Sequence, residues 1–262
     1  MQRITHGMNA TSISRTLAPA MALLMALLAA VPVQASVVLS GTRVIYPQHE
    51  KEVTLRLESK NQRPVLLQVW LDNGDEQSTP DLAGIPFLVT PPIFRMEPEQ
   101  HQVLRLSYTG EPLPQERESL FWFNLLEVPS QALDAEQSNQ LQLAFRTRVK
   151  LFFRPTKLPY EVEAAAAKLQ WRHVSSEQGQ MLEVYNPTPY HLSFDQIELV
   201  AAGQRHAREP GASGAENMVL PNGRNRFLLP SLKSRPSTAM TAEFETIDDF
   251  GVRVSHKARI TP

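Results

Sequence analysis

No cysteine occurs among the 262 residues of this chain, so its core must hold together without disulfide bonds. The chain also lacks an excess of positive charge, because 26 lysines and arginines stand against 27 aspartates and glutamates. A nucleic-acid-binding surface normally requires a clearly basic domain, so the composition points away from a nucleic-acid partner. Long stretches of helical periodicity and repeats of solenoid length are missing as well, which argues against a helical repeat protein.

The sequence motifs of common enzymes and metal sites are also missing. There is no G-x-S-x-G, no H-E-x-x-H and no phosphate-cradling glycine loop. Residues 49–53 read His-Glu-Lys-Glu-Val, so the second histidine of a zinc helix is absent, and the seven histidines are scattered singly. We therefore expect no cofactor, no metal and no catalytic residue, although a serine, a histidine and an acid distant in sequence could still meet in the fold.

No apolar run reaches the roughly 20 residues that a membrane-spanning helix needs. The longest, from Leu17 to Val31, follows Arg3 and Arg15 and precedes small or modest side chains up to Ala35, a pattern typical of a cleaved secretory signal. Removal of residues 1–35 would leave 24 basic against 27 acidic residues, a net charge near −3. We expect an exported protein without a membrane anchor, whose remaining chain is long enough for one large domain or two ordinary ones.

The chain is instead rich in short alternating apolar runs that are separated by turn residues. Strong breakers such as Asp72-Asn73-Gly74 and Thr90-Pro91-Pro92 lie between the runs. About seven strands of ordinary length in roughly 120 residues predict an antiparallel sandwich of immunoglobulin type. The clearest runs in this half are 53–57, 65–71, 103–108, 118–128 and 141–150.

A second domain of the same class is expected after Arg154-Pro155, where two prolines bracket a short polar segment. This places the domains at 36–155 and 156–262. Residues 161–170 could form a turn or two of helix, and the Gly-, Ala- and charge-rich segment 203–217 predicts an exposed loop. The strand pattern resumes in 181–184, 190–200, 226–229, 238–245 and 252–260. The expected fold class is all-β, with two sandwiches.

The segment from Leu141 to Lys150 combines an apolar face with a basic one. In an extended strand, successive side chains point to opposite faces. The segment then runs into Leu151-Phe152-Phe153, which abandons the alternation and predicts burial on both faces. The apolar face carries Leu141, Leu143, Phe145 and Val149, and the polar face carries Gln142, Arg146, Arg148 and Lys150.

Two cations next to apolar strands, Arg43 and Lys150, are candidate binding residues. They could be solvated charges at strand ends, as most such residues are. They could instead converge on a carboxylate, because an arginine fork and a lysine ammonium together form a good anion site. Spacing alone leaves both interpretations open.

Several blocks of this sequence resemble the periplasmic pilus chaperones of the chaperone/usher pathway, the PapD-like family. They cover both predicted domains in the family's order. The resemblance implies two immunoglobulin-like domains arranged as a boomerang with an interdomain cleft. The moderate loop 129–140 and the absence of cysteine resemble the short-loop branch of that family. The blocks are Gly-Thr-Arg-Val-Ile-Tyr-Pro (41–47), Thr90-Pro91-Pro92 with Arg95 and Pro98, Arg-Glu-Ser-Leu-Phe-Trp-Phe-Asn (117–124), Thr-Arg-Val-Lys-Leu-Phe-Phe-Arg-Pro (147–155) and Asn-Pro-Thr-Pro-Tyr (186–190).

The resemblance implies a non-enzymatic periplasmic chaperone that binds pilus subunits by donor-strand complementation. By family position, Arg43 and Lys150 would anchor the C-terminal carboxylate of a subunit in the cleft. Leu141, Leu143 and Phe145 would insert into the subunit, whose own sandwich lacks its last strand. The chaperone would then deliver the subunit to an outer-membrane usher.

Two further sets of residues take roles from the same resemblance. An ion network between the domains would consist of Glu118, Arg154 and Asp249. Usher docking would fall near Pro64 and Leu66, which is a looser match. We also expect the free protein to self-associate weakly, because its apolar row is otherwise left in water.

Two alternatives come from other functional classes. A pilus subunit or adhesin with immunoglobulin-like domains would need an N-terminal extension of alternating apolar residues after the signal, and residues 36–40 are too short for this. A periplasmic hydrolase on a sandwich scaffold would need a catalytic constellation that no motif indicates.

Overall fold

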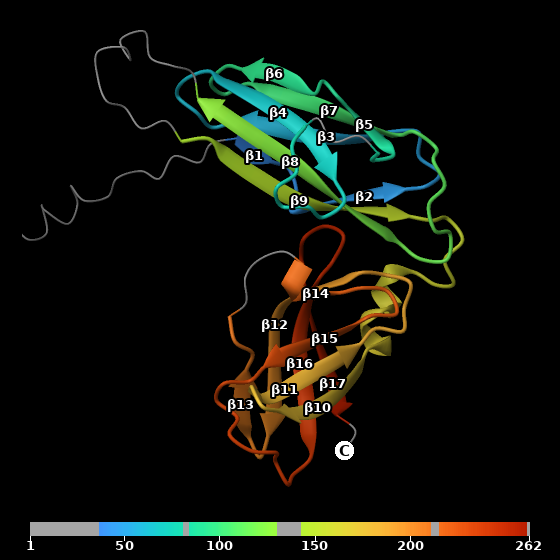
Figure 1. Ribbon diagram of the computed structural model, residues 1–262, viewed down its shortest axis with the longest axis vertical. Coiled ribbons are helices and arrows are strands. Elements are labelled where there is room, and N and C mark those ends of the chain that lie inside the picture. Colours follow the sequence, from blue (N-terminus) through green and yellow to red (C-terminus); the bar gives the residue numbers. More distant parts are fainter. Residues whose placement is uncertain (1–36, 81–83, 130–142, 211–214, 261–262) are drawn as a thin grey trace, which may run out of the picture. The chain divides into compact units, whose positions relative to one another are not determined.

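The computed structural model describes residues 37–80, 84–129, 143–210 and 215–260. The predicted signal and Leu141 lie outside these residues. Within them the chain folds almost entirely into strands, arranged as two sandwiches (Figure 1). The expected all-β class with two sandwiches is confirmed. In this part of the chain, no helix has the length and apolar character needed to cross a membrane.

Strands β1 to β9 build the first sandwich (Figure 1). One sheet has the order β1-β3-β7-β5, and the other has the order β2-β9-β8-β4-β6. The predicted runs 53–57, 65–71, 103–108 and 118–128 correspond to β3, β4, β7 and β8. The bounds are β1 Val37–Leu39, β2 Arg43–Pro47, β3 Val53–Ser59, β4 Val65–Asp72, β5 Phe87–Thr90, β6 Ile93–Met96, β7 His101–Tyr108, β8 Ser119–Pro129 and β9 Phe145–Arg154.

Alternation of side chains decides which residues of β2 reach the core. Val44 and Tyr46 are buried, and the hydroxyl of Tyr46 accepts a hydrogen bond from the backbone N–H of Tyr108 at 3.0 Å. Because successive strand residues point to opposite faces, Arg43 lies on the face turned away from this core. By the same rule Lys150 of β9 lies on that outer face.

Strands β10 to β17 build the second sandwich (Figure 1). Its sheets have the orders β10-β11-β15 and β13-β12-β16-β17, with β14 pairing β12. Aromatic rings fill its core, and the ring centroids of Trp171 and Phe244 lie 4.7 Å apart. The bounds are β10 Gln170–Ser176, β11 Gly179–Tyr185, β12 Leu192–Ala201, β13 Gln204–Ala207, β14 Met218–Val219, β15 Arg224–Leu228, β16 Met240–Ile247 and β17 Arg253–Ile260.

The prediction of an exposed loop over residues 203–217 is wrong in part. Ala202 and Gly203 adopt positive φ angles of 47° and 78°, so the chain turns tightly after β12. Strand β13 then pairs back on β12, and His206 is buried. The Gly- and charge-rich composition hid this edge strand because its polar residues face solvent. The short 3₁₀ helix η4, Ala215–Asn217, follows.

The predicted helix over 161–170 is reduced to two short 3₁₀ helices, η2 (Val162–Ala164) and η3 (Ala166–Lys168). The predicted strand over 141–150 begins only at Phe145 in the part of the chain that the structure describes. Leu151, Phe152 and Phe153 are buried as expected.

Strand β9 has two neighbours over only half of its length. It pairs antiparallel with β8 from Phe145 to Phe153, but parallel with β2 only from Lys150 to Arg154. The chain preceding β2 leaves this sheet, because β1 pairs with β3 of the opposite sheet. Among the described residues, no strand therefore covers the edge of β9 between Phe145 and Val149.

Candidate functional site

Arg43 and Lys150 lie opposite each other as register partners of the parallel β2–β9 pair. Arg43 donates from Nη1 to the carbonyl of Ile247 at 2.7 Å, while its buried Nε has no hydrogen-bond partner. Lys150 donates from Nζ to the hydroxyl of Ser193 at 3.1 Å. Neither cation forms an ion pair with a carboxylate among the described residues. The parallel pairing thus holds two unneutralised cations side by side.

Burial shapes the electrostatics of this pair. It lowers the pKa of Lys150 to about 8, and the positive charge of Arg43 adds to the effect. Burial also lowers the pKa of Arg43, although Asp249, Asp248 and Glu118 oppose the change. A carboxylate placed between the two side chains would relieve this repulsion, so the pair is suited to bind an anion.

An open cleft of about 710 Å³ lies in front of the two cations. Residues from both sandwiches line it, so an occupant would touch both. Trp122 forms part of its wall, and its ring lies 5.9 Å from Nζ of Lys150. The remaining lining residues are Thr42, Arg43, Arg148, Val149 and Lys150 from the first sandwich, and Asp195, Ile247, Gly251, Val252 and Arg253 from the second.

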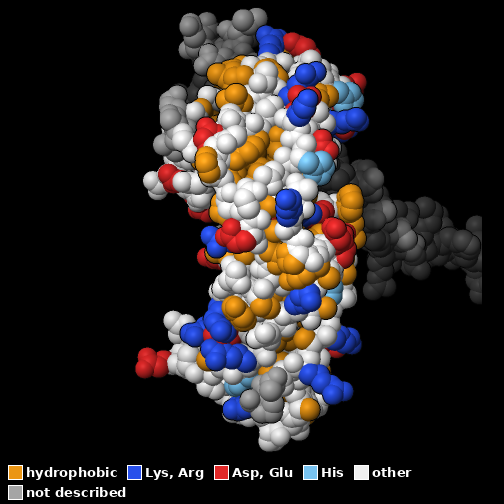
Figure 2. Space-filling view, turned by 90° about the vertical axis from the view of Figure 1, so that its right-hand side faces the viewer, with side chains coloured by type: hydrophobic (Ala, Val, Ile, Leu, Met, Phe, Trp, Pro, Cys, Tyr) orange, Lys and Arg blue, Asp and Glu red, His pale blue; other side chains and the backbone are white. Residues whose placement is uncertain are grey.

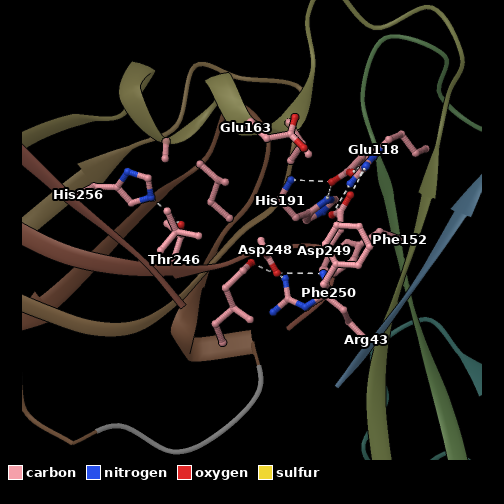
Figure 3. A pocket seen from close by; sticks show the side chains of 16 residues that line it. Arg43, Glu118, Phe152, Glu163, His191, Thr246, Asp248, Asp249, Phe250 and His256 are labelled. Carbon is pink, nitrogen blue, oxygen red and sulfur yellow. Dashed lines mark hydrogen bonds and ion pairs between the residues drawn. The ribbon is translucent and has the colours of Figure 1, made fainter. Parts of the chain in front are cut away.

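Arg154 joins Glu118 of the first sandwich to Asp249 of the second. Figure 3 shows these two carboxylates near each other. Arg154 donates to Glu118 at 2.8 Å and to both oxygens of Asp249 at 2.5 and 2.8 Å. The second oxygen of Glu118 accepts the backbone N–H of His191 at 2.8 Å. Burial disfavours the charge of Arg154, but hydrogen bonds and charges from Asp249 and Glu118 outweigh it and raise its pKa.

The predicted apolar row is exposed where β9 begins. Leu143 and Phe145 are 54% and 57% exposed, whereas Val149 on the same face is buried in the first core. The row therefore begins with exposed residues, beside an edge that no described strand covers, and ends with a residue of the protein's own core. Leu141, which would continue it, lies outside the described residues.

Two family models match this chain. The model described as "Pili and flagellar-assembly chaperone, PapD N-terminal domain" matches residues 36–159, and "Pili assembly chaperone PapD, C-terminal domain" matches residues 164–258. The chain belongs to the PapD family of pilus-assembly chaperones. The resemblance noted in the sequence is thereby confirmed, and so is the chaperone function in pilus assembly.

Curated relatives of this pilus chaperone cover most of its length. It is 41% identical over 230 residues to the probable fimbrial chaperone YadV of Escherichia coli, covering 86% of this chain and 90% of the relative. It is 36% identical over 231 residues to the chaperone protein FimB/FhaD of Bordetella pertussis, covering 87% and 89%.

Solved structures agree with this placement. The crystal structure of the YadV chaperone matches with a TM-score of 0.72 and 38% identity, covering 86% of this chain and all of that one. The structure of the Salmonella enterica SafA pilin in complex with the SafB chaperone matches with a TM-score of 0.68 and 29% identity, covering 86% and 96%. The family is one of periplasmic chaperones.

A polar cluster that we did not predict lies on the outer face of β9. Arg148 donates to both oxygens of the buried Asp72 at 2.8 and 3.0 Å, and Arg146 donates to Oδ1 of Asn124 at 2.8 and 3.0 Å. Asn124 donates in turn to Asp72 at 2.7 Å. The guanidinium carbons of Arg146 and Arg148 each lie 4.8 Å from an indole ring, that of Trp70 and of Trp122 respectively.

This cluster fixes the polar face of the pilus chaperone's open edge. Burial opposes ionisation of Asp72, but hydrogen bonds from Asn124, from the Gly74 N–H and from Ser78 lower its pKa. One signal for the cluster was visible in the sequence, because Asn124 interrupts an otherwise apolar run. Asp72 gave no such signal, since it also fits the turn that follows β4.

The residues proposed for usher docking lie apart from the cleft. Leu66 of β4 is exposed and pairs across the sheet with Val128, which is also exposed, whereas Pro64 before the strand is partly buried. Neither Pro64 nor Leu66 lines the cleft described above. The visible face of the molecule mixes positive and negative side chains (Figure 2), in keeping with its small net charge.

Proposed function

We propose that this chaperone binds pilus subunits by pairing the open edge of β9 with them and by anchoring their C-terminal carboxylate at Arg43 and Lys150. The proposal rests mainly on one observation. Among the described residues, no strand covers the edge of β9 from Phe145 to Val149, and this edge leads directly to two cations that no described carboxylate neutralises. SafB, a chaperone of the same fold, was solved in complex with the SafA pilin, which supports a subunit as the partner.

The open edge supplies affinity. Its N–H and C=O groups, which pair with no described strand, can accept an added strand by β-augmentation. Burying Leu143 and Phe145 in a subunit would contribute about 3–6 kcal/mol before the costs of association are subtracted. Leu141, two residues earlier on the same face, would extend the row.

The cation pair supplies register. A carboxylate held by Arg43 and Lys150 fixes where the last residue of the subunit lies along β9. A slip by one residue would turn the wrong side chains inward, because strand side chains alternate strictly. The anchor therefore excludes a one-residue slip and keeps Leu143 and Phe145 facing the subunit.

Other residues have roles outside the binding of the subunit's last strand. The contacts of Arg154 with Glu118 and Asp249 hold the two sandwiches on either side of the cleft. Pro64 and Leu66 take part in docking on an outer-membrane usher. We also propose export through a signal at residues 1–35, weak self-association of the free form through its apolar row, and the absence of catalysis, cofactor and metal.

Co-expression with a cognate subunit tests the anchor. We expect Arg43→Ala and Lys150→Ala to lower the amount of soluble subunit in the periplasm at least tenfold. Lys157→Ala serves as the control, because it removes an exposed positive charge close to the domain boundary. Wild-type levels of soluble subunit with both anchor variants would refute the proposal. Recovery of this chain in surface fibres would instead favour the pilus-subunit alternative.

A further inference from the structure

The turn between β16 and β17 carries the most exposed large apolar side chain among the described residues. Phe250 is 87% exposed and Val252 is 57% exposed, and Val254 follows on β17 with 39%. In the described part of the second sandwich, only Leu220 is a further exposed large apolar residue. Exposed apolar side chains of this sandwich are therefore concentrated in one turn, and such concentration marks interaction sites.

Hydrogen bonds within the turn, from side chain and backbone, hold its conformation. The carboxylate of Asp248 accepts hydrogen bonds from the N–H groups of Phe250 at 2.9 Å and Val252 at 2.7 Å. The N–H of Asp248 donates to the carbonyl of Val252 at 2.9 Å, and Gly251 adopts a φ of +84°. Phe250 and Val252 are thus presented to solvent by a fixed scaffold, which lowers the ordering cost of binding.

The turn also lies against the anion site. A Cβ atom on Gly251 would meet the hydroxyl of Thr42 at 2.7 Å, so the turn packs closely on the residue that precedes Arg43. Arg43 itself donates to the carbonyl of Ile247, the last residue of β16. Figure 3 shows Arg43, Asp248, Asp249 and Phe250 gathered at one side of a pocket of about 140 Å³.

The two side chains of the turn line two separate spaces, both of which are also lined by Arg43 and Ile247. Val252 lines the open cleft together with Arg43 and Lys150, and Phe250 lines the smaller pocket together with Arg43. A chain whose terminal carboxylate reaches Arg43 and Lys150 must enter through the cleft that Val252 lines. Its last residues consequently pass beside this turn.

We propose that the β16–β17 turn is a second docking surface for the pilus subunit, in which Phe250 and Val252 contact apolar side chains next to the subunit's C-terminus. The inference rests on the proposed subunit binding in the cleft. Continuity of Val252 with the anchor residues in one cleft selects the subunit as the occupant. In this proposal the first sandwich pairs with a strand of the subunit, and the second sandwich contacts the residues next to the subunit's C-terminus.

The rate at which a purified chaperone–subunit complex dissociates tests this surface. We expect Phe250→Ser combined with Val252→Ser to speed dissociation at least tenfold, and each single change to speed it several-fold. Leu88→Ser is the control, because Leu88 is 62% exposed on β5 and does not line the cleft. Because the changed side chains are exposed, the unfolding midpoint should stay at the wild-type value in all variants.

Lys150→Ala, measured in parallel, separates the two proposals. If Lys150→Ala speeds dissociation and the double variant does not, the turn is no docking surface while the anchor stands. If neither change has an effect, the proposed binding in the cleft fails as a whole. The double variant could also leave subunit dissociation unchanged but abolish self-association of the free protein or binding to the usher. Either result would assign the turn to a second copy of the chaperone or to the usher, and would overturn the inference. Should the double variant fold poorly, Phe250→Ala and Val252→Thr provide the same comparison.

Discussion

The two halves of β9 have the same strand geometry but different surroundings. From Lys150 to Arg154 the strand lies between β8 and β2, and Leu151 and Phe153 are fully buried. From Phe145 to Val149 it has β8 alone among the described strands, and Phe145 is more than half exposed. The presence of β2 makes the difference. Where β2 pairs, the strand is enclosed in its own sheet, and where β2 is absent, no other described strand covers its edge.

The change occurs at the Arg43–Lys150 pair, where β2 begins. An uncovered edge strand is normally an aggregation hazard. Here the polar face of the uncovered half is tied down by Arg146 and Arg148, which bind Asn124 and Asp72. This half is therefore exposed on its apolar face without being free to detach. The partner proposed above would meet a strand that is already ordered, so its binding would not bear the free-energy cost of ordering this edge.

The strongest contrast between the halves should appear when one phenylalanine in each is removed. Phe153→Ala creates a cavity in the first core, so we expect it to lower the free energy of unfolding by about 3–5 kcal/mol. Phe145→Ala removes an exposed side chain, so we expect a change within about 0.5 kcal/mol. Urea denaturation of the two purified variants measures both values.

Subunit binding should rank the same two variants in the opposite way. Phe145→Ala should weaken the chaperone–subunit complex about tenfold or more, because it removes roughly 1.5–3 kcal/mol of buried apolar surface. Equal destabilisation of the chaperone by both substitutions would contradict the division of β9 into a structural half and a binding half.

A change at Asp72 should loosen the half of β9 from Phe145 to Val149, which the Asp72 cluster holds to the sheet. Asp72→Ala leaves Arg146 and Arg148 without their buried counter-charge, and we expect a loss of about 3 kcal/mol in the free energy of unfolding. Amide hydrogen exchange should accelerate more at Phe145–Val149 than at Leu151–Phe153. Glu52→Ala is the control and should change neither quantity, because it removes an exposed carboxylate whose one described ionic contact is Arg105. Uniform acceleration along the whole of β9 would show that the cluster does not act on the open half in particular.

The regular strands could be predicted because side-chain alternation is a local property. In β3, Leu55 and Leu57 are buried while Thr54 and Arg56 are exposed, as the pattern indicated. Short strands such as β1 and β5 were not predicted, since distant partners decide whether they pair. Strand β13 was missed for a related reason, as its residues are mostly polar and only its pairing with β12 defines it.

The candidate site depended still more on non-local structure. Nothing in the alternation around Arg43 or Lys150 indicates that a parallel pairing makes them neighbours, although they lie far apart in the sequence. The residue types left their convergence open, and the resemblance to a known family favoured it. Asp72 and Arg148 meet in the same way, through the order of strands in one sheet. The apolar row at Leu143 and Phe145, by contrast, was readable from the sequence because a single strand carries it.

The smallest expected effect concerns the residue at which the two halves join. The pKa of Lys150 is about 8, so its charge is present at pH 7 and largely lost by pH 9. We expect subunit affinity to fall several-fold between these pH values, since a neutral amine holds a carboxylate poorly. Lys150→Arg keeps its charge and should show a flatter profile. A parallel fall in both proteins would contradict the role of Lys150.

Folding stability should respond to the same titration with the opposite sign. An unfolded chain holds the Lys150 proton up to its ordinary pKa of 10.5, whereas the folded chain releases it near 8. Between these values the unfolded state binds more protons, so the free energy of unfolding rises with pH. Urea denaturation at pH 7.5 and 9.5 gives the change in the free energy of unfolding between these pH values. The contribution of Lys150 is the amount by which this change is larger in wild type than in Lys150→Met. Because affinity falls while stability rises over the same interval, a single lysine would be shown to lower the stability of the free chaperone while strengthening its binding to a subunit.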